Sequence, residues 1–304
     1  MTSADVRRLL LLAAVWGGSF IFIRLTVPAI GPVATVEARV LIAGLALLAL
    51  SRISGATLNL RAMWREYAVL GVLNSALPFL LISTAELRLS ASMAAILNAT
   101  SPLFGAIIAS IWLKDPLTAR KILGIAIAMA GIVVLLGWSR IEPDTATLLS
   151  IVASLLAAIC YGLAGAYTRA KVHGASPLGM ATGSQIAAAI IMAPAMLVAP
   201  PHSMPSTSVI ACILMLALLS TALAYILYFR LVVDVGPAKA LTVTFLTPIF
   251  GVIWSAFFLS EHITTVKVTA CAIILTGTAF VTGKSAARAT SAEKQSAIKE
   301  SISS

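Results

Sequence analysis

ATSPLFG (residues 99–105) and FLTPIFG (residues 245–251) are two apolar stretches in which a glycine follows a proline by three positions. A proline inside a helix removes one backbone hydrogen bond and costs about 3 kcal/mol in water. The two stretches lie 146 positions apart. The recurrence of so costly a motif indicates that the chain contains two copies of one structural unit.

The correspondence extends beyond these prolines. At the offset of 146, the matching pairs are Leu113 with Leu259, Asp115 with Glu261, Thr118 with Thr264, Lys121 with Lys267 and Gly131 with Gly277. At an offset of 145, they are Gly17 with Gly162, Arg24 with Arg169 and Pro32 with Pro177. Because these residue types are rare in so apolar a chain, their recurrence in register favours an internal repeat.

The composition places most of the chain in lipid. Of its 304 residues, 60% are hydrophobic and 11% are charged, and the mean hydropathy is +1.03. A soluble domain of this size cannot bury that much apolar surface. The net charge of +10 is spread thinly between apolar runs, so we expect the lipid bilayer and no nucleic acid as its partner.

The apolar runs predict ten membrane spans. A helix needs about 20 residues to cross a hydrocarbon core about 30 Å thick. Runs of this length occur near residues 8–27, 33–51, 67–86, 91–113, 119–138, 147–168, 177–198, 207–229, 237–259 and 264–283. The predicted fold class is therefore an all-α integral membrane protein.

The basic residues predict the orientation. If the N-terminus is cytoplasmic, 16 of the 21 Lys and Arg residues fall on that side and four on the other, while Arg39 lies within a span. Cytoplasmic loops carry such an excess of positive charge. We therefore expect a multi-pass membrane protein with both termini in the cytoplasm.

The repeat predicts two inverted halves. Each copy holds five spans, and because five is odd the second copy crosses the membrane in the opposite sense. We expect residues 1–140 to form the first repeat, 141–283 the second, and 284–304 a polar cytoplasmic tail. Secondary transporters are commonly built this way, with the substrate site between the repeats near mid-membrane.

Several motifs together resemble a known family. They are AAVWGGSFIFIR (13–24), EARVLIAGLALL (37–48) and the two proline cassettes, which continue as LKDPLTARKILGIAIAMAG and LSEHITTVKVTACAIILTG. In order and duplication, over residues 8–283, the chain resembles a bacterial ten-span member of the drug/metabolite transporter superfamily, of the EamA type. The resemblance implies export or exchange of amino acids and other small metabolites by alternating access, without a bound cofactor.

The two prolines predict hinges that face a polar interior. Pro102 and Pro248 leave the carbonyls of Asn98 and Thr244 without their usual helical donors. In lipid such carbonyls must be satisfied by polar groups or by water in a cavity. We interpret both prolines as cavity-facing hinges, with a passive packing kink as the alternative.

Arg39 is the basic residue placed clearly inside a span, and an intramembrane ionisable group is a functional-site hypothesis. Its guanidinium can bind a substrate carboxylate through two hydrogen bonds. Glu37, two positions earlier, points to another face of the helix and is our candidate for proton coupling. We expect Glu37 to meet Arg24 at the outer end of the first span. Facilitated diffusion or exchange needs no such group and is slightly preferred.

Further residues complete the predicted substrate site. Polar groups within spans can donate hydrogen bonds to a solute, and aromatic rings can form apolar cavity walls. The full predicted set is Trp16, Phe20, Arg39, Asn74, Phe79, Asn98, Ser101, Tyr161, Gln185, Tyr225, Thr244 and Trp254. For any single member, a role in packing or in joining helices is the alternative.

Small residues on the fifth and tenth spans, among them Gly124 and Gly277, predict close helix contact, and a weak homodimer through them is the alternative to a monomer. An intramembrane enzyme is a remote alternative, because the sequence shows neither a nucleophile motif nor a metal-ligand pattern. A passive channel for small solutes is the closer rival. We therefore predict a secondary carrier of small organic metabolites, with amino acids, including large apolar or aromatic ones, as the leading substrates.

Overall fold

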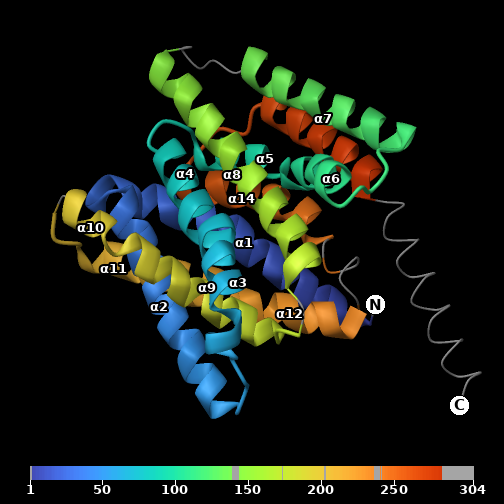
Figure 1. Cartoon of the computed structure of the whole chain (residues 1–304). Helices are drawn as coiled ribbons and strands as arrows, with labels where there is room; N and C mark the ends of the chain where they lie inside the picture. The colour runs from blue at the N-terminus through green and yellow to red at the C-terminus, as the bar shows by residue number, and fades with distance from the viewer. Residues whose placement is uncertain are drawn as a thin grey trace, which may run out of the picture.

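The computed structural model describes residues 2–138, 144–172, 174–201, 203–235, 240 and 242–282. Every regular element in these residues is helical (Figure 1), which confirms the all-α prediction. In the described part of the chain, nine helices are long and apolar enough to cross a membrane, and α14 is a shorter apolar helix. Together they account for the ten predicted spans. The predicted tail, residues 284–304, lies outside the described residues.

The helices follow the predicted runs closely. Those of the first five spans are α1 (Ser3–Ile30), α2 (Pro32–Ile53), α3 (Leu60–Gly71), the π-helical segment η1 (Val72–Ala76), α4 (Leu77–Ala85), α5 (Ala91–Asn98), α6 (Ser101–Trp112) and α7 (Ala119–Trp138). Those of the last five are α8 (Thr145–Lys171), α9 (Pro177–Met192), α10 (Ala195–Val198), α11 (Thr207–Leu214), the π-helical segment η2 (Met215–Leu223), α12 (Ala224–Val235), α14 (Val243–Leu259) and a last helix, Thr265–Thr282.

Matching residues begin matching helices. Pro32 and Pro177 stand at the start of α2 and α9, where a missing N–H costs nothing. The repeat seen in the sequence is therefore also a repeat of local structure.

The two halves interlock through pairs of glycines. α1 packs against α14, and α8 packs against α6. A Cβ on Gly17 would lie 2.7 Å from the backbone nitrogen of Gly251, and a Cβ on Gly162 would lie 2.7 Å from that of Gly105. Because Gly17 corresponds to Gly162 and Gly105 to Gly251, the same crossing is built twice. Each crossing joins the first span of one half to the fourth span of the other.

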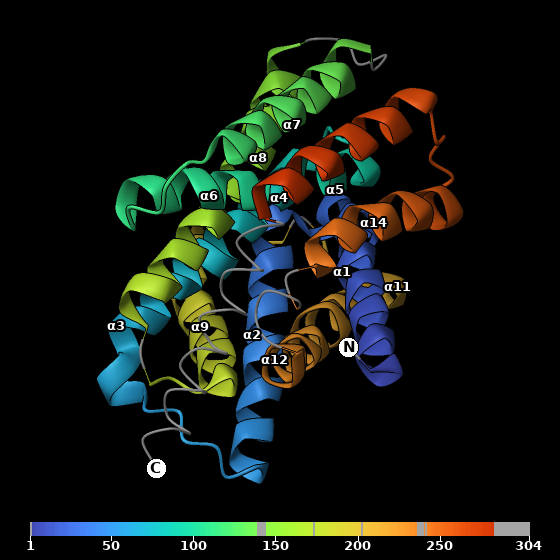
Figure 2. The ribbon, with the colours of Figure 1, turned by 90° about the vertical axis from the view of Figure 1, so that its right-hand side faces the viewer.

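α7 and the last helix lie side by side at one edge of the bundle (Figures 1 and 2). A Cβ on Gly124 would lie 2.6 Å from the carbonyl oxygen of Gly277, and a Cβ on Gly131 would lie 2.7 Å from the Ile274 side chain. The predicted close contact therefore occurs within the chain. The small-residue faces of α7 and the last helix, which suggested a dimer, pack against each other.

The outer surface of the bundle is apolar. Leu45, Ile111 and Val133 are each more than half exposed although they belong to spans. Buried polar side chains such as Ser75, Thr182 and Gln185 lie inside instead. This reversal of the soluble pattern is expected when lipid surrounds the protein.

Candidate functional site

Two π-helical segments lie at matching places in the third and eighth spans. At the offset of 145, η1 (Val72–Ala76) corresponds to residues 217–221, which fall within η2 (Met215–Leu223). In η2, the Thr221 hydroxyl donates to the carbonyl of Leu216, five residues earlier, at 3.0 Å. Such widened turns are frequent at functional sites. Here they direct polar side chains of NSALP (74–78) and LSTAL (219–223) towards the second and seventh spans.

Arg39 meets η2 in the interior of the bundle. The residue is 6% exposed, and its Nε donates to Oγ1 of Thr221 at 2.9 Å. Its guanidinium carbon lies 3.5 Å from the centre of the Phe79 ring, an arrangement that favours a cation. Within the described residues this is the one hydrogen bond of the Arg39 side chain, and no carboxylate forms an ion pair with it. Donor capacity is therefore left for an anionic ligand.

Gln185 meets η1 in a related way. Its Nε2 donates to Oγ of Ser75 at 2.8 Å. Because Gln185 follows the repeat counterpart of Arg39 by one position, each half sends a polar residue from its second span to the π-helical segment of the other. The Oε1 atom of Gln185 is buried and has no hydrogen-bond partner among the described residues. An acceptor is therefore also available here.

Two tyrosines complete the cluster. Nδ2 of Asn74 donates to the hydroxyl of Tyr225 at 2.7 Å. Tyr161 and Tyr225 both lie close enough to Arg39 to act on it electrostatically. Tyr161 also packs against the apolar group that contains Phe79. We name this arrangement the Arg39 cluster; its members are Arg39, Asn74, Ser75, Phe79, Tyr161, Gln185, Thr221 and Tyr225.

Six predicted substrate residues therefore come together, and the sequence reasoning missed Ser75 and Thr221. Both are small hydroxyl residues, which are common in helices and give little signal alone. Their repeat relationship offered a clue, because Ser75 corresponds to Ser220 and the hydroxyl pair Ser220–Thr221 interrupts an apolar run.

The structure places the other predicted residues elsewhere. Trp16 stacks obliquely on Tyr228 with ring centres 5.6 Å apart, and Nε1 of Trp254 donates to the carbonyl of Ala14 at 3.0 Å. Phe20 is buried in another apolar group, which Tyr161 connects to the group around Phe79, and Thr244 lies on α14. These four line the contact of α1 with α12 and α14 or lie near it.

The two prolines differ in their local structure. Before Pro102 the fourth span is interrupted, since α5 ends at Asn98 and α6 begins at Ser101. The Ser101 hydroxyl donates to the Asn98 carbonyl at 2.6 Å, which satisfies the acceptor that Pro102 cannot reach. Pro248 instead lies inside the uninterrupted helix α14.

The expected contact of Glu37 with Arg24 does not form. Arg24 donates from Nη1 to the backbone carbonyl of Glu86 and, at 3.5 Å, to that of Leu89. Glu37 is half-buried, and its Oε2 has no hydrogen-bond partner among the described residues. The interpretation of Glu37 as Arg24's partner was wrong because the neighbouring third span brings carbonyls closer to Arg24.

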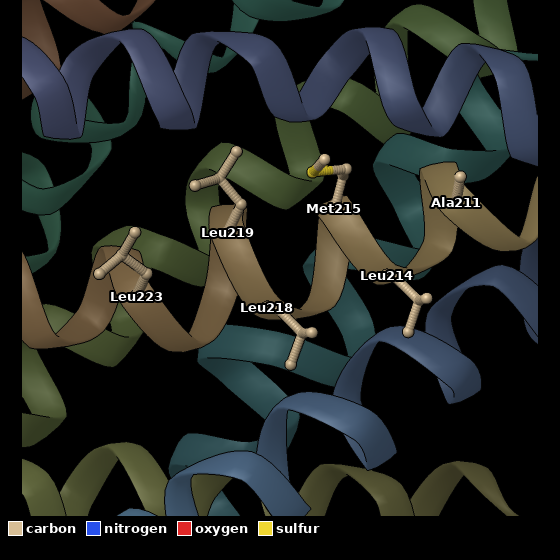
Figure 3. A pocket seen from close by; sticks show the side chains of 6 residues that line it. All are labelled: Ala211, Leu214, Met215, Leu218, Leu219 and Leu223. Atoms are coloured by element: carbon tan, nitrogen blue, oxygen red, sulfur yellow. The ribbon is translucent and has the colours of Figure 1, made fainter.

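A shallow pocket lies along α11 and η2, and no residue of the Arg39 cluster lines it. Its lining residues are Ala211, Leu214, Met215, Leu218, Leu219 and Leu223 (Figure 3). All six side chains are apolar, and Met215 is 50% exposed. A pocket of this kind suits a lipid chain better than a polar metabolite.

Comparisons with known proteins agree on one kind of protein. The model of the EamA-like transporter family matches residues 8–137 and again 148–283. An uncharacterized transporter of Archaeoglobus fulgidus is 22% identical over 273 residues, which cover 88% of this chain and 95% of that protein. The uncharacterized inner membrane transporter YedA of Escherichia coli K12 is 26% identical over 276 residues, covering 88% and 87%. One crystal structure superposes with a TM-score of 0.67 at 16% identity, over 93% of this chain and 97% of that one, and so shows the fold alone.

Proposed function

Because the chain belongs to the EamA-like transporter family, we propose that it is a secondary carrier that exports or exchanges small organic metabolites across the inner membrane. Amino acids, including large apolar or aromatic ones, are the proposed substrates. They bind at the Arg39 cluster while the two interlocked halves rearrange by alternating access. No covalent chemistry is required of the protein.

One observation carries the proposal: a buried arginine without a carboxylate partner among the described residues lies where both halves meet. Guanidinium groups bind carboxylates through paired, charge-assisted hydrogen bonds. A buried charge in a membrane is costly and is expected to serve a substrate or ion pathway. Thr221 and Phe79 hold the guanidinium in place, so the bound geometry is prepared in advance.

The rest of an amino acid finds partners in the same cluster. The Gln185 Oε1 atom can accept a hydrogen bond from an α-ammonium group. The Phe79 and Tyr161 rings supply an apolar wall for the side chain. A substrate with one carboxylate, one ammonium and an apolar side chain therefore matches the groups present.

Counterflow tests this proposal. Purified protein is reconstituted into vesicles that are preloaded with one L-amino acid, and uptake of the same labelled amino acid is measured for each of the twenty. A carrier gives saturable uptake that depends on preloading. Linear uptake without saturation for unrelated solutes supports the passive channel instead.

A matched pair of variants tests the site. Loss of a hydrogen bond to a charged group costs about 1.5–3 kcal/mol. R39Q is therefore expected to raise the substrate concentration for half-maximal counterflow at least about tenfold. R52Q, which changes an exposed arginine on the same helix, is the control and keeps wild-type counterflow. Equal half-saturation in R39Q and wild type would exclude Arg39 as the anion site.

We also propose a monomer with both termini in the cytoplasm, because the Gly124 and Gly277 faces that suggested a dimer pack against each other within the chain. The positive charges of the loops support the orientation. Reporter tags inserted at residues 142 and 172 test it, because they flank the sixth span: the tag at 142 must emerge on the periplasmic face and the tag at 172 on the cytoplasmic face. Tags that emerge on the same face would contradict the inverted arrangement.

A further inference from the structure

Glu86 is a buried carboxylate that the site described above does not use. It follows α4 directly, at the end of the third span, and is 1% exposed. Neither carboxylate oxygen has a hydrogen-bond partner among the described residues. Buried polar atoms are nearly always paired, so a carboxylate with two unpaired oxygens needs an explanation.

The neighbouring charges leave this carboxylate unpaired. Arg24 from α1 binds the backbone carbonyl of Glu86 rather than its side chain. Glu261, from the segment after α14, already accepts from the Ala91 amide at 2.9 Å and from the Ser92 hydroxyl, and Lys267 lies 3.3 Å from it. Glu261 therefore brings a negative charge near Glu86 and donates no hydrogen bond to it.

Two further groups of charges complete the surroundings of Glu86. Arg39 from α2 acts on Glu86 electrostatically. Arg88 and Asp144 come within 3.9 Å of each other, but their side chains are largely exposed and lie towards solvent. Arg24 and, more weakly, Arg39 therefore attract the Glu86 carboxylate, whereas Glu261 repels it. The Arg39 guanidinium lies over the Phe79 ring, two helical turns before Glu86 on α4.

The repeat shows that this environment belongs to one half alone. Arg169 and Asp115, the counterparts of Arg24 and Glu261, form an ion pair at 2.8 Å. The position that corresponds to Glu86 is Leu231, which carries no carboxylate. The buried carboxylate is therefore an addition to the duplicated plan, not a consequence of it.

The chemistry favours a proton over a metal ion as the ligand of Glu86. An isolated ionised carboxylate is costly in an apolar interior and tends to become neutral. Sodium, magnesium and calcium ions need several oxygen ligands. No group of three or more His, Cys, Asp or Glu residues able to hold a metal occurs in the described part of the chain.

We propose that Glu86 is the proton-binding residue of the transport cycle and that its proton binds together with a substrate carboxylate at Arg39. The coupling of this proton to a substrate carboxylate at Arg39 rests on the proposed function. In the empty carrier the positive charges of Arg24 and Arg39 reduce the cost of ionising the buried Glu86. A carboxylate on Arg39 cancels the charge of Arg39, so a proton binds one oxygen of Glu86 when substrate binds and leaves from it when substrate leaves.

The sign of this coupling sets the mode of transport. Each ligand increases the affinity for the other, and by linkage the effect is reciprocal. Substrate and proton therefore cross in the same direction, one proton with each substrate carboxylate. A carrier that moves substrate and proton in opposite directions would instead require that binding of one prevents binding of the other.

The proton site is tested without any substrate. Infrared spectra of the protein in lipid nanodiscs are recorded during a pH titration for wild type, E86Q, E86D and E66Q. We expect a carboxyl band that titrates above the value of about 4.3 typical of an exposed glutamate. E86Q should lack the band, whereas E86D and E66Q, which changes a half-buried glutamate at the other end of the same span, should keep it. A band unchanged in E86Q, or no such band in wild type, would overturn the proposal.

The coupling is tested in vesicles that contain a pH-sensitive dye, with L-phenylalanine and L-leucine as probes. Wild-type vesicles should acidify inside as the probe enters, and E86Q should give no acidification while retaining counterflow. Loss of acidification in E37Q but not in E86Q, or uptake driven by sodium ions, would overturn the coupling. If wild type moves no amino acid while the infrared band behaves as expected, the proposed function fails and the proton site remains.

Discussion

Gly17 lies directly against Gly251 where α1 crosses α14, and the repeat places Gly162 against Gly105 in the same way. The backbones approach so closely that neither Gly17 nor Gly162 has room for a Cβ atom. Because each crossing joins the two halves, movement of one half must change both contacts together. These glycine pairs are therefore among the contacts that must change when one half moves relative to the other.

Replacing Gly17 tests this packing. In G17A the new Cβ would lie 2.8 Å from the Thr247 carbonyl oxygen, so the helices must move apart. Overpacking of this kind costs about 1–3 kcal/mol. We expect a lower midpoint of thermal unfolding for the purified protein in detergent. G18A is the matched control, because its nearest neighbour would be Trp254 at 3.9 Å. Equal midpoints for the two variants would contradict the account of the crossing.

Thr221 is expected to act as a positioning residue for Arg39. In T221V the Arg39 Nε loses its hydrogen bond while the shape of the side chain is kept. A net loss of about 1 kcal/mol corresponds to roughly a fivefold higher substrate concentration for half-maximal counterflow, while the maximal rate is largely kept. T276V, which changes an exposed threonine on the last helix, is the control. An effect on the maximal rate alone would argue against a positioning role.

Pro102 and Pro248 are predicted to be hinges. P102A allows a continuous helix to form across the interruption between Asn98 and Ser101, and P248A restores a donor inside α14. Both variants should slow the initial rate of transport while the amount of folded protein in the membrane stays the same. Unchanged rates in both variants would leave the prolines as passive packing features.

Acid should weaken the contact of Glu261 with the start of α5. Burial acts to raise the pKa of Glu261, but the Ser92 hydroxyl, the Lys267 ammonium and the Ala91 amide together hold the pKa below its ordinary value of 4.5. A carboxylate with a lowered pKa stabilises the fold above its unfolded-state pKa, and that contribution is lost as pH falls through the folded-state pKa. Thermal stability should therefore fall as pH decreases below about 4.5, and less steeply in E261Q. Parallel pH profiles would contradict this assignment.

The sequence was sufficient for the spans and for the repeat, because lipid imposes long apolar runs and rare residues keep their register. Pro32 and Pro177 are examples, since both begin helices as their spacing predicted. The position of Arg39 inside a span was likewise enough to identify it as a candidate, as an intramembrane charge is unusual whatever surrounds it.

The partners of these residues could not be predicted from the sequence. The contact of Arg39 with Thr221 joins positions 182 residues apart and depends on the extra residue in the π-helical turn of η2. Local patterns do not show where such a turn occurs. The sequence pointed to Glu37 because Glu37 lies well inside its span, whereas the burial of Glu86 at a span end comes from packing between distant helices.

Ser75 provides the most direct test of the central claim, that the Arg39 cluster is reached in turn from each side of the membrane. Its side chain is fully buried here, so a thiol at this position reacts only if the bundle opens. In protein whose three cysteines are replaced by serine, S75C is treated with a membrane-impermeant maleimide from either face of oriented vesicles. The account predicts labelling from both faces that slows with a saturating transported amino acid. Labelling from one face alone, or from neither, would contradict it.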